Sequence, residues 1–338
     1  MIDDGELSLS SASLTAQRVA GAALVEVASD GTVSVHSAGT RSAALEATEA
    51  TEATVDAQTV FEGASLSKPC FALAVLKLAR SGEFPLDEPL QRYSENLRGL
   101  GNSASTITAR HLLSHMSGLP NWRTKHAFRV WFPPGDRFSY SSEGYFCLQQ
   151  AAEAVTGKSA EQLAQELVFQ PLGMQRTSYV WQSRFEENHA LPHESDAPEA
   201  KSKPELPNAS ASLHTTAADY GLFLRALLRG ELLETSAEPW LAPVVAVPAA
   251  NPMSLDAPAP LHPQLSWGLG WGLVPAAALF LHWGANPGFR ALVVGSLQER
   301  RALAVFTNAD AGLQLAADRG IRAFPAADPV RSWLGISA

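Results

Sequence analysis

Cysteine is scarce in this chain, and basic residues are outnumbered. The 338 residues include two cysteines, Cys70 and Cys147, which are too few for a disulfide framework. Lysine and arginine number 25 against 34 aspartate and glutamate residues, which gives a net charge of −9. Because binding to phosphate backbones requires a basic surface, this balance argues against nucleic acid as the main partner, and none is expected.

Long apolar runs and a secretory signal are also missing. The longest uncharged stretch, residues 265–281, contains three glycines and a proline and predicts two strands and a turn, whereas a membrane span needs about 20 mostly apolar residues. Residues 1–6 are acidic and polar, whereas a secretory signal starts with positive charge before an apolar run. We therefore expect a cytoplasmic protein without a membrane partner, and the sequence leaves its oligomeric state open.

Lysine is rare beside arginine, with six lysines and 19 arginines in the chain. Arginine keeps its proton at any working pH, so chemistry that needs a neutral amine depends on lysine. The candidates for such chemistry are Lys68, Lys77, Lys125, Lys158, Lys201 and Lys203.

Local patterns predict strands near both chain ends and helices between them. Residues 21–40 predict a hairpin, and a capping box at residues 159–162 opens a helix that ends before Pro171. Further helices are predicted over residues 70–79, 108–115, 142–155 and 311–323, and further strands over 268–274, 279–283, 291–296 and 303–307. This order predicts an α/β fold whose sheet is built from both chain ends, with a helical insertion.

Three segments predict irregular structure. The Glu-Ala-Thr repeats at residues 46–54 predict a solvated connection. Residues 183–209 and 239–263 are rich in proline, and loops of this length commonly serve as lids or binding walls.

Ser65-Leu66-Ser67-Lys68 lies just before the predicted helix at residues 70–79. Pro69 lacks an N–H and fits only in the first helical turn, so the helix should start near Ser65 and place Ser65 and Lys68 on one face. An amine whose pKa is lowered by desolvation can take the serine proton, and the free N–H groups of a helix start favour negative charge beside Ser65. None of the other five lysines has a serine three residues before it.

Two further elements accompany this motif. Tyr140-Ser141-Ser142 precedes a predicted helix, and a phenol beside a lysine can be held partly as phenolate and relay protons; a tyrosine that merely packs at a helix start is the alternative. Residues 281–289 form a strand that breaks at a glycine-rich turn, where glycine lets a ligand or another backbone approach closely. Such an edge can supply an N–H to an oxyanion, and an ordinary hairpin bend is the alternative.

In this order the three elements resemble the serine β-lactamase and penicillin-binding-protein superfamily. The closest resemblance is to its class C-like branch, which also holds family VIII carboxylesterases, D-aminopeptidases and acyltransferases, and which uses Ser-x-x-Lys, Tyr-x-Asn and a Lys/His-x-Gly strand. The resemblance covers roughly residues 19–323 and is supported by Phe61–Pro69, Leu112–Pro120, Phe169–Met174 and Asn286–Phe289. It implies an antiparallel sheet domain of residues 1–69 and 210–338, a mainly helical domain of residues 70–209, and an active site at their junction.

The resemblance also implies the role of each site residue. Ser65 would be the acylated nucleophile, Lys68 its proton acceptor and Tyr140 a second acid/base. Ser142 would replace the asparagine that orients the lysine and the substrate. The backbone N–H groups of Ser65 and Ala285 would form the oxyanion hole.

Three residues depart from the family pattern, and all lie at implied substrate-binding positions. Ser142 lacks the amide donor of asparagine. His282 stands where classical β-lactamases keep lysine, and a mostly neutral imidazole attracts a substrate carboxylate only weakly at pH 7. Trp283, before Gly284, replaces a small hydroxyl residue and adds an apolar wall. These changes count against efficient β-lactam hydrolysis and favour a neutral, partly hydrophobic ester, thioester or amide.

We therefore expect a serine hydrolase that forms an acyl-enzyme on Ser65 and is esterase-like, with a small neutral or hydrophobic ester or amide as substrate. Alternatives with the same acyl-enzyme are an acyltransferase, a peptide cyclase, a β-lactamase or a D-peptidase, and a different alternative is a non-catalytic binding protein on the same fold. No cofactor is expected. No metal is expected either, because His111 and His115 lie four apart without a His-Glu-x-x-His motif.

Overall fold

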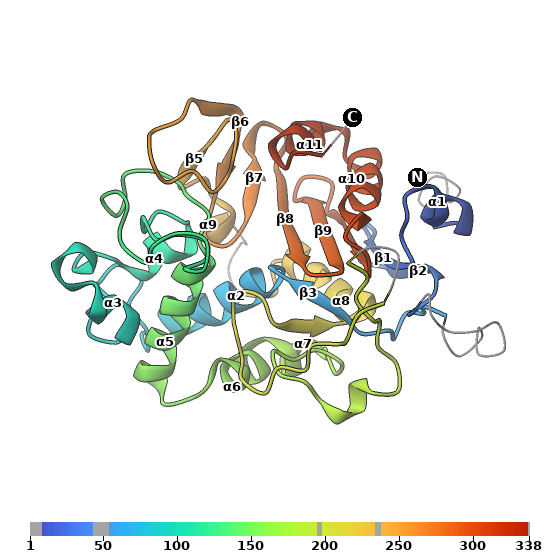
Figure 1. Cartoon of the computed structure of the whole chain (residues 1–338), viewed down its shortest axis with the longest axis horizontal. Helices are drawn as coiled ribbons and strands as arrows, with labels where there is room; N and C mark the ends of the chain where they lie inside the picture. Colours follow the sequence, from blue (N-terminus) through green and yellow to red (C-terminus); the bar gives the residue numbers. More distant parts are fainter. Residues whose placement is uncertain (1–8, 43–53, 195–197, 234–237, 337–338) are drawn as a thin grey trace.

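The computed structural model describes residues 9–42, 54–194, 198–233 and 238–336. The acidic first six residues and almost all of the Glu-Ala-Thr repeats lie outside these ranges. An eight-stranded antiparallel sheet dominates the fold, in the order β2-β1-β10-β9-β8-β7-β6-β5 (Figure 1). Its strands are β1 (Gly21–Val27), β2 (Val33–Gly39), β5 (Val245–Pro248), β6 (Leu261–Trp267), β7 (Gly272–Val274), β8 (Leu279–Asn286), β9 (Phe289–Ser296) and β10 (Arg301–Thr307). Because β1 pairs with β10, the prediction of a sheet built from both chain ends is confirmed.

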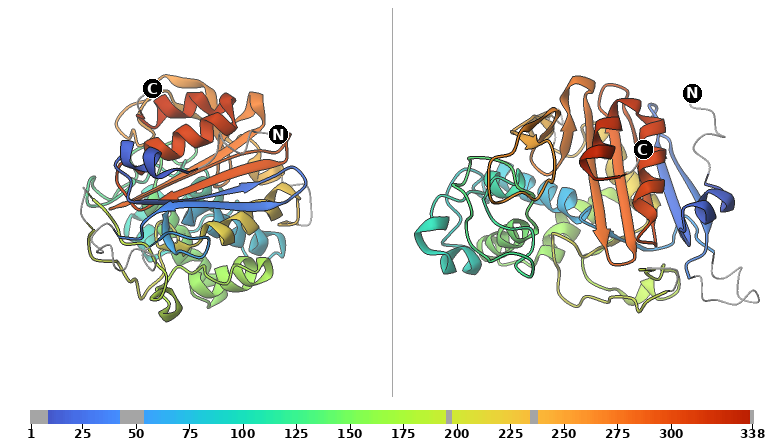
Figure 2. Two further views of the ribbon diagram at one scale, coloured as in Figure 1. Left: turned by 90° about the vertical axis from the view of Figure 1, so that its right-hand side faces the viewer. Right: turned by 45° about the horizontal axis from the view of Figure 1, so that its top comes forward.

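Helices cover both faces of this sheet, as the left view of Figure 2 shows. Side chains alternate between the faces of a strand, so each strand supplies apolar residues to two separate layers. On one face α8 (Ala217–Leu228) packs so closely that a Cβ on Gly221 would meet Val25. On the other face α10 (Gly312–Ala323) packs on β9 and β10. The fold is therefore a mixed α/β arrangement of sheet and flanking helices, as predicted.

A second, two-stranded sheet leads into a long and largely buried helix. β3 (Phe61–Ala64) pairs with β4 (Leu213–Thr215) and contacts β8, β9 and β10. It is followed by α2 (Ser67–Arg80), most of whose residues are buried, which confirms the helix predicted at residues 70–79. The helix starts two residues after Ser65, because Ala64 has a left-handed φ of 47° and the chain needs one further turn before it becomes helical.

The middle of the chain is helical where the sequence predicts it. α4 (Ala109–Leu113), α5 (Ser142–Thr156) and α6 (Ala160–Ala164) lie where helices are predicted, and α6 has the predicted capping box. The prediction that this last helix ends before Pro171 is wrong, since a π-helical turn leads into α7 (Gln170–Leu172). The carbonyl of Leu167, four residues before the proline, accepts a 2.8 Å hydrogen bond from Lys77 Nζ instead, which satisfies the group that proline leaves without a donor.

The segment at residues 239–263 is more regular than predicted. It contains most of α9 (Glu238–Leu241), all of β5 and the start of β6, while the strand predicted from residue 268 begins at Gly272 as β7. The proline in β6 obscures the strand pattern, and it is tolerated where the pairing with β5 shifts register. Besides α9, four α-helices of the described residues have no counterpart in the sequence prediction, namely α1 (Ser11–Ala16), α3 (Glu95–Gly99), α8 and α11 (Asp328–Trp333).

The described part of residues 183–209 contains one short 3-10 turn at Ser183–Phe185 and is otherwise irregular, as predicted. The division into domains at residues 69/70 and 209/210 stays a prediction. Among the described residues, no helix combines the length and apolar character that crossing a membrane requires.

Candidate active site

Ser65 lies in a tight turn between β3 and α2. Leu66 N–H donates to Gly63 O at 2.9 Å, and Lys68 N–H donates to Ser65 O at 3.0 Å, so the turn is closed on both sides of the serine. Ser67 Oγ accepts a 3.0 Å bond from the N–H of Leu213 in β4, which ties the turn to the neighbouring strand. Left-handed backbone at a non-glycine residue such as Ala64 persists only where surrounding structure enforces it, and these bonds supply that enforcement.

Lys68 is fully buried and directed at Ser65. Its Nζ lies 3.0 Å from Ser65 Oγ, 3.1 Å from Ser142 Oγ and 2.7 Å from Ser210 O. Burial holds the pKa of this amine well below its ordinary value of 10.5, because no carboxylate compensates the charge. The side chain is therefore able to hold a neutral amine near neutral pH.

The three contacts of Lys68 fix the direction of the lone pair in that neutral state. A neutral amine has two N–H donors and one lone pair. A carbonyl can only accept, so Ser210 O takes one N–H, and Ser142 Oγ can take the other. The lone pair is then left for the hydroxyl proton of Ser65, which is the geometry of a base poised for a serine nucleophile.

Tyr140 lies beside the amine and is held by aromatic rings. Its ring centroid is 4.9 Å from Lys68 Nζ, 4.3 Å from the ring of His115 and 4.9 Å from that of Trp283. Its hydroxyl is buried and has no hydrogen-bond partner among the described residues. Burial raises the pKa of Tyr140, with the nearby Ser65 hydroxyl acting in the opposite direction. The expectation of a partial phenolate is therefore wrong, since the apolar surroundings favour the protonated phenol.

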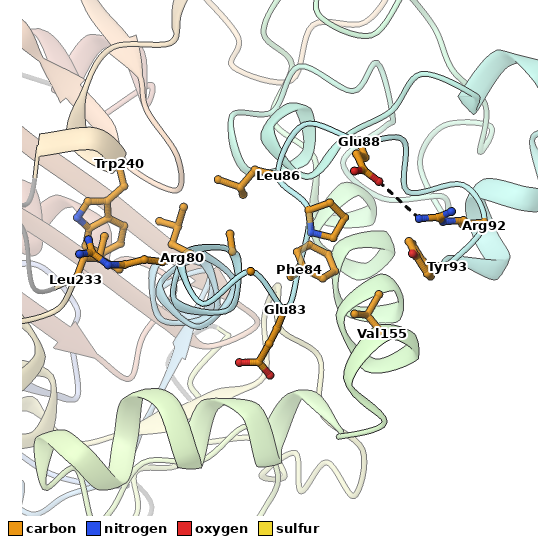
Figure 3. Close-up of a pocket in the computed structure, with 14 residues that line it drawn as sticks. Arg80, Glu83, Phe84, Leu86, Glu88, Arg92, Tyr93, Val155, Leu233 and Trp240 are labelled. Atoms are coloured by element: carbon orange, nitrogen blue, oxygen red, sulfur yellow. Dashed lines mark ion pairs between the residues drawn. The ribbon is translucent and has the colours of Figure 1, made fainter.

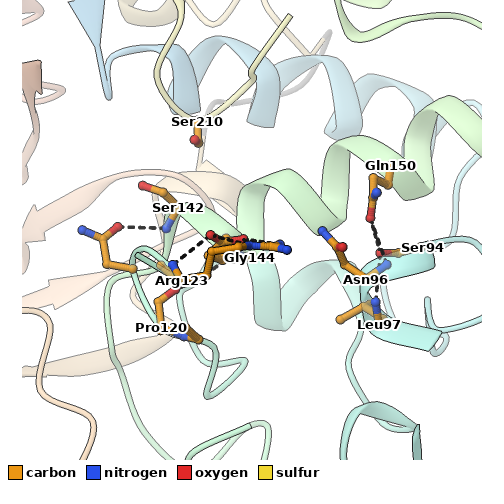
Figure 4. Close-up of polar contacts among 12 residues, drawn as sticks. Ser94, Asn96, Leu97, Pro120, Arg123, Ser142, Gly144, Gln150 and Ser210 are labelled. Atoms are coloured by element: carbon orange, nitrogen blue, oxygen red, sulfur yellow. Dashed lines mark hydrogen bonds and ion pairs between the residues drawn. The ribbon is translucent and has the colours of Figure 1, made fainter. Parts of the chain in front are cut away.

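Ser142 is held at the start of α5 by a network of polar contacts, part of which is drawn in Figure 4. Its N–H donates to Asn121 Oδ1 at 3.0 Å. The preceding Ser141 caps the helix and donates from Oγ to Pro120 O at 2.7 Å. Arg123 binds Glu143 through both carboxylate oxygens. These contacts fix the hydroxyl of Ser142 against Lys68, where the predicted replacement for asparagine was expected.

Strand β8 passes directly against the turn that carries Ser65. A Cβ on Gly284 would lie 2.4 Å from Gly63 O, so only glycine allows this approach. His282 shares the face of Gly284, because side chains two residues apart point the same way. Trp283 points to the other face and packs among buried aromatic residues, including Tyr140 and Trp333. The predicted apolar wall therefore lies behind Tyr140, whose ring Trp283 contacts.

The backbone of Ala285 is available to a ligand. The hairpin pairs Asn286 with Phe289 across two residues, which makes that pair hydrogen-bonded and the next pair, Ala285 with Arg290, non-hydrogen-bonded. The N–H of Ala285 therefore points away from β9. On that side β7 pairs with β8 only as far as Leu281, so the N–H meets no strand. This is the backbone arrangement that the predicted oxyanion role requires.

Two buried histidines flank the site, and both are neutral. Nδ1 of His282 bonds to its neighbour's carbonyl, Trp283 O, at 2.8 Å, and burial with the nearby Lys68 lowers the pKa of His282 to about 3. His115 accepts from Ser141 N–H at 3.0 Å, and burial likewise holds its pKa well below 6.5. The site consequently has no cationic histidine at neutral pH.

Sequence reasoning missed two residues of this site. The carbonyl of Ser210 contacts Lys68, but a backbone acceptor leaves no signal in side-chain patterns. The ring of His115 packs against that of Tyr140, and His115 has a left-handed φ of 57°, although the sequence suggested only the end of a helix there.

A separate cavity of about 630 Å³ lies at the opposite end of α2, lined by residues including Arg80, Phe84 and Trp240 (Figure 3). It is about 20 Å of helix away from Ser65 and is distinct from this site.

Comparison with known proteins finds several that are similar to this chain. A 172-residue match to the esterase EstB of Burkholderia gladioli is 31% identical and covers 42% of this chain and 43% of the esterase. Penicillin-binding protein 4* of Bacillus subtilis is 23% identical over 292 residues, covering 74% of this chain and 60% of that protein. Both matches thus span less than two thirds of the relative. The structure of D-alanine carboxypeptidase AmpC from Burkholderia cenocepacia superposes with a TM-score of 0.72 at 19% identity, covering 90% of this chain and 94% of the other.

One family model matches almost the whole described chain. The beta-lactamase family model aligns with residues 9–328, which include the turn at Ser65, the start of α5 and strand β8. The chain belongs to the beta-lactamase family.

Proposed function

We propose that this protein is a serine hydrolase that forms an acyl-enzyme on Ser65 and acts on a neutral ester. The observation that carries the proposal is Lys68 Nζ at 3.0 Å from Ser65 Oγ, fully buried and without a carboxylate partner. A general base must be within hydrogen-bond reach of its proton, and this amine is; burial also holds its pKa well below 10.5, which favours the neutral form that can accept the proton.

In the acylation step, Lys68 accepts the proton of Ser65 as Oγ attacks the ester carbonyl. The negative charge on the carbonyl oxygen is stabilised by the N–H groups of Ser65 and Ala285. The ester bond to the leaving alcohol then breaks, and the protonated phenol of Tyr140 donates to the departing oxygen. Lys68 then passes the proton that it took from Ser65 to the oxygen of Tyr140, which restores the neutral amine and the phenol.

Deacylation uses the same groups in reverse. A water molecule takes the place of the leaving alcohol, and its proton passes by way of the Tyr140 phenol to the neutral amine of Lys68. The water oxygen bonds to the acyl carbon, the bond from that carbon to Ser65 Oγ breaks, and Lys68 returns the proton to Ser65 Oγ as the acid is released. The same intermediate serves acyl transfer when an alcohol or amine takes the place of water.

The charge of the site supports a neutral substrate. His282 has a pKa of about 3, and Lys68 is buried with a lowered pKa, so neither offers a full positive charge to a carboxylate. Arg123 is engaged by Glu143 through both oxygens. The name of the relative from Burkholderia gladioli, an esterase, supports the same substrate class.

A matched pair of esters tests the substrate class. We expect kcat/KM for phenyl butyrate to exceed that for 3-carboxyphenyl butyrate by about tenfold or more, because the carboxylate loses water without gaining a cationic partner. Release of the phenol is measured by absorbance for both esters, after correction for their different uncatalysed rates. Equal or faster turnover of the carboxylate ester would contradict the proposal of a neutral substrate.

A further inference from the structure

A buried ion pair lies on the strand that leads to Ser65. Lys201 Nζ contacts Glu62 Oε1, and the two side chains are only 3% and 9% exposed. Glu62 belongs to β3, three residues before Ser65, whereas Lys201 comes from the irregular segment between residues 183 and 209. Lys201 Nζ also lies 3.0 Å from His214 Nε2 and over the ring of Phe289, which closes the pair off from water.

The second carboxylate oxygen of Glu62 holds strand β8. Asn286 Nδ2 donates to Glu62 Oε2 at 2.7 Å and to Ala211 O at 3.1 Å. Asn286 is the last residue of β8 and directly follows Ala285. Beyond Leu281 the β7 ladder no longer supports this strand, which stays paired with β9 as far as Asn286, so the side chain of Asn286 is an anchor on the open side.

The same cluster reaches the segment that binds the catalytic base. Ala211, which accepts from Asn286, follows Ser210, whose carbonyl accepts from Lys68 at 2.7 Å. Three backbone elements of the site therefore meet at Glu62: the strand leading to Ser65, the end of β8 beside Ala285, and residues 210–211 beside Lys68.

We propose that Lys201, Glu62 and Asn286 form a positioning network that sets the distance between the N–H groups of Ser65 and Ala285 in the oxyanion hole. The inference rests on the acyl-enzyme chemistry proposed above. Lys201 holds Oε1 of Glu62 in a buried place, and this fixes Oε2 as the acceptor of the Asn286 amide. Lys201 and Glu62 contact no reacting atom, so they are positioning residues.

Removal of Lys201 should impair the chemical step more than substrate binding. In Lys201→Met the carboxylate of Glu62 loses the group that holds its Oε1, so it is free to turn or to draw in water, and Asn286 loses a fixed acceptor and keeps its contact with Ala211 O. We expect kcat for phenyl butyrate to fall by about 10- to 100-fold, which is the usual effect of displacing an oxyanion donor by about 1 Å, with KM within about twofold of wild type. Rates are referred to the concentration of protein that a fluorophosphonate titrates.

Two further variants separate positioning from stability. In the double variant Glu62→Gln with Lys201→Met, the amide oxygen still accepts from Asn286 and no uncompensated charge remains, so kcat should recover to within about threefold of wild type. Lys203→Met is the matched control, because Lys203 is two residues away, about half exposed and paired with Glu186 at the surface. It should leave kcat and KM unchanged. Wild-type kcat in Lys201→Met, or a double variant no faster than Lys201→Met, would overturn the proposal.

Hydrogen exchange tests the same network without any substrate. By mass spectrometry, amide exchange in a peptide covering residues 279–290 should be faster in Lys201→Met than in wild type, and unchanged in Lys203→Met. Faster exchange in a protein that hydrolyses no ester would refute the proposed hydrolase and leave the network standing. Unchanged exchange in Lys201→Met would refute the network even if the wild type is an active esterase.

Discussion

Ser65→Ala is expected to lower the rate of phenyl butyrate hydrolysis by at least about 10³-fold, to the level that the oxyanion donors and binding alone support. Alanine removes the only atom that forms the acyl bond, while the turn itself is held by the backbone of Gly63 and Lys68 and by Ser67. Initial rates of phenol release measure the effect, with thermal unfolding as a check on folding.

Ser81→Ala is a suitable control for this variant. Ser81 follows the other end of α2, where its hydroxyl bonds to Leu78 O and Glu83. Its rate should equal that of wild type. If Ser65→Ala retained more than about a tenth of the wild-type rate, a different nucleophile would have to carry the reaction.

Lys68→Arg is the second variant with a very large expected effect, again about 10³-fold or more on kcat. Arginine keeps the positive charge but cannot release its proton at working pH, so it cannot act as a base. The longer, planar guanidinium must also fit the space of Lys68, which is 0% exposed and contacts Ser142 Oγ and Ser210 O. Lys158→Arg, at an exposed lysine paired with Glu166, is the control and should have wild-type activity.

The wild-type pH profile supplies an independent check of this base. The neutral amine is the active form, so kcat/KM should rise with pH through the pKa of Lys68 and fall away below it. Since burial holds that pKa well below 10.5, the rise should be complete far below pH 10. A rate that still climbs in proportion to hydroxide up to pH 10, or a fully active Lys68→Arg, would show that Lys68 is only an electrostatic support.

Local patterns were sufficient for the parts of the fold that depend on neighbouring residues. The helix α5 was predictable from Ser141 or Ser142 at its start and Gly157 at its end, where φ is 69°. The hairpin of β1 and β2 followed from alternation and an Asp-Gly turn. Strand β6 was missed because Pro263 and exposed residues break its alternation, and because its pairing with β5 is set by long-range contacts.

The candidate site, too, was predictable where it depends on neighbouring residues and not where it depends on contacts between distant ones. Ser65 and Lys68 were predictable because they are three residues apart at the start of a helix, although the structure places Ser65 in the turn just before it. Tyr140, Ser142 and the β8 strand followed from the family resemblance. The partnership of Lys201 with Glu62 joins residues 139 apart in sequence, and no local pattern encodes such a contact.

The protonation state of Tyr140 could not be predicted from the sequence either. The expected phenolate assumed only a neighbouring lysine, whereas the rings of His115, Trp267 and Trp283 surround the phenol and raise its pKa by desolvation. The sign of a pKa shift depends on this balance between a nearby charge and burial, and burial is a property of the folded chain.

The central claim is that the acyl-enzyme forms on Ser65, and peptide mapping of a trapped adduct tests it most directly. Wild-type protein is treated with a fluorophosphonate, digested and analysed by tandem mass spectrometry beside Ser65→Ala treated in the same way. We predict one phosphonyl group per wild-type chain, located on Ser65, and none on the variant. An adduct on another residue, equal labelling of both proteins, or no labelling of either would contradict it.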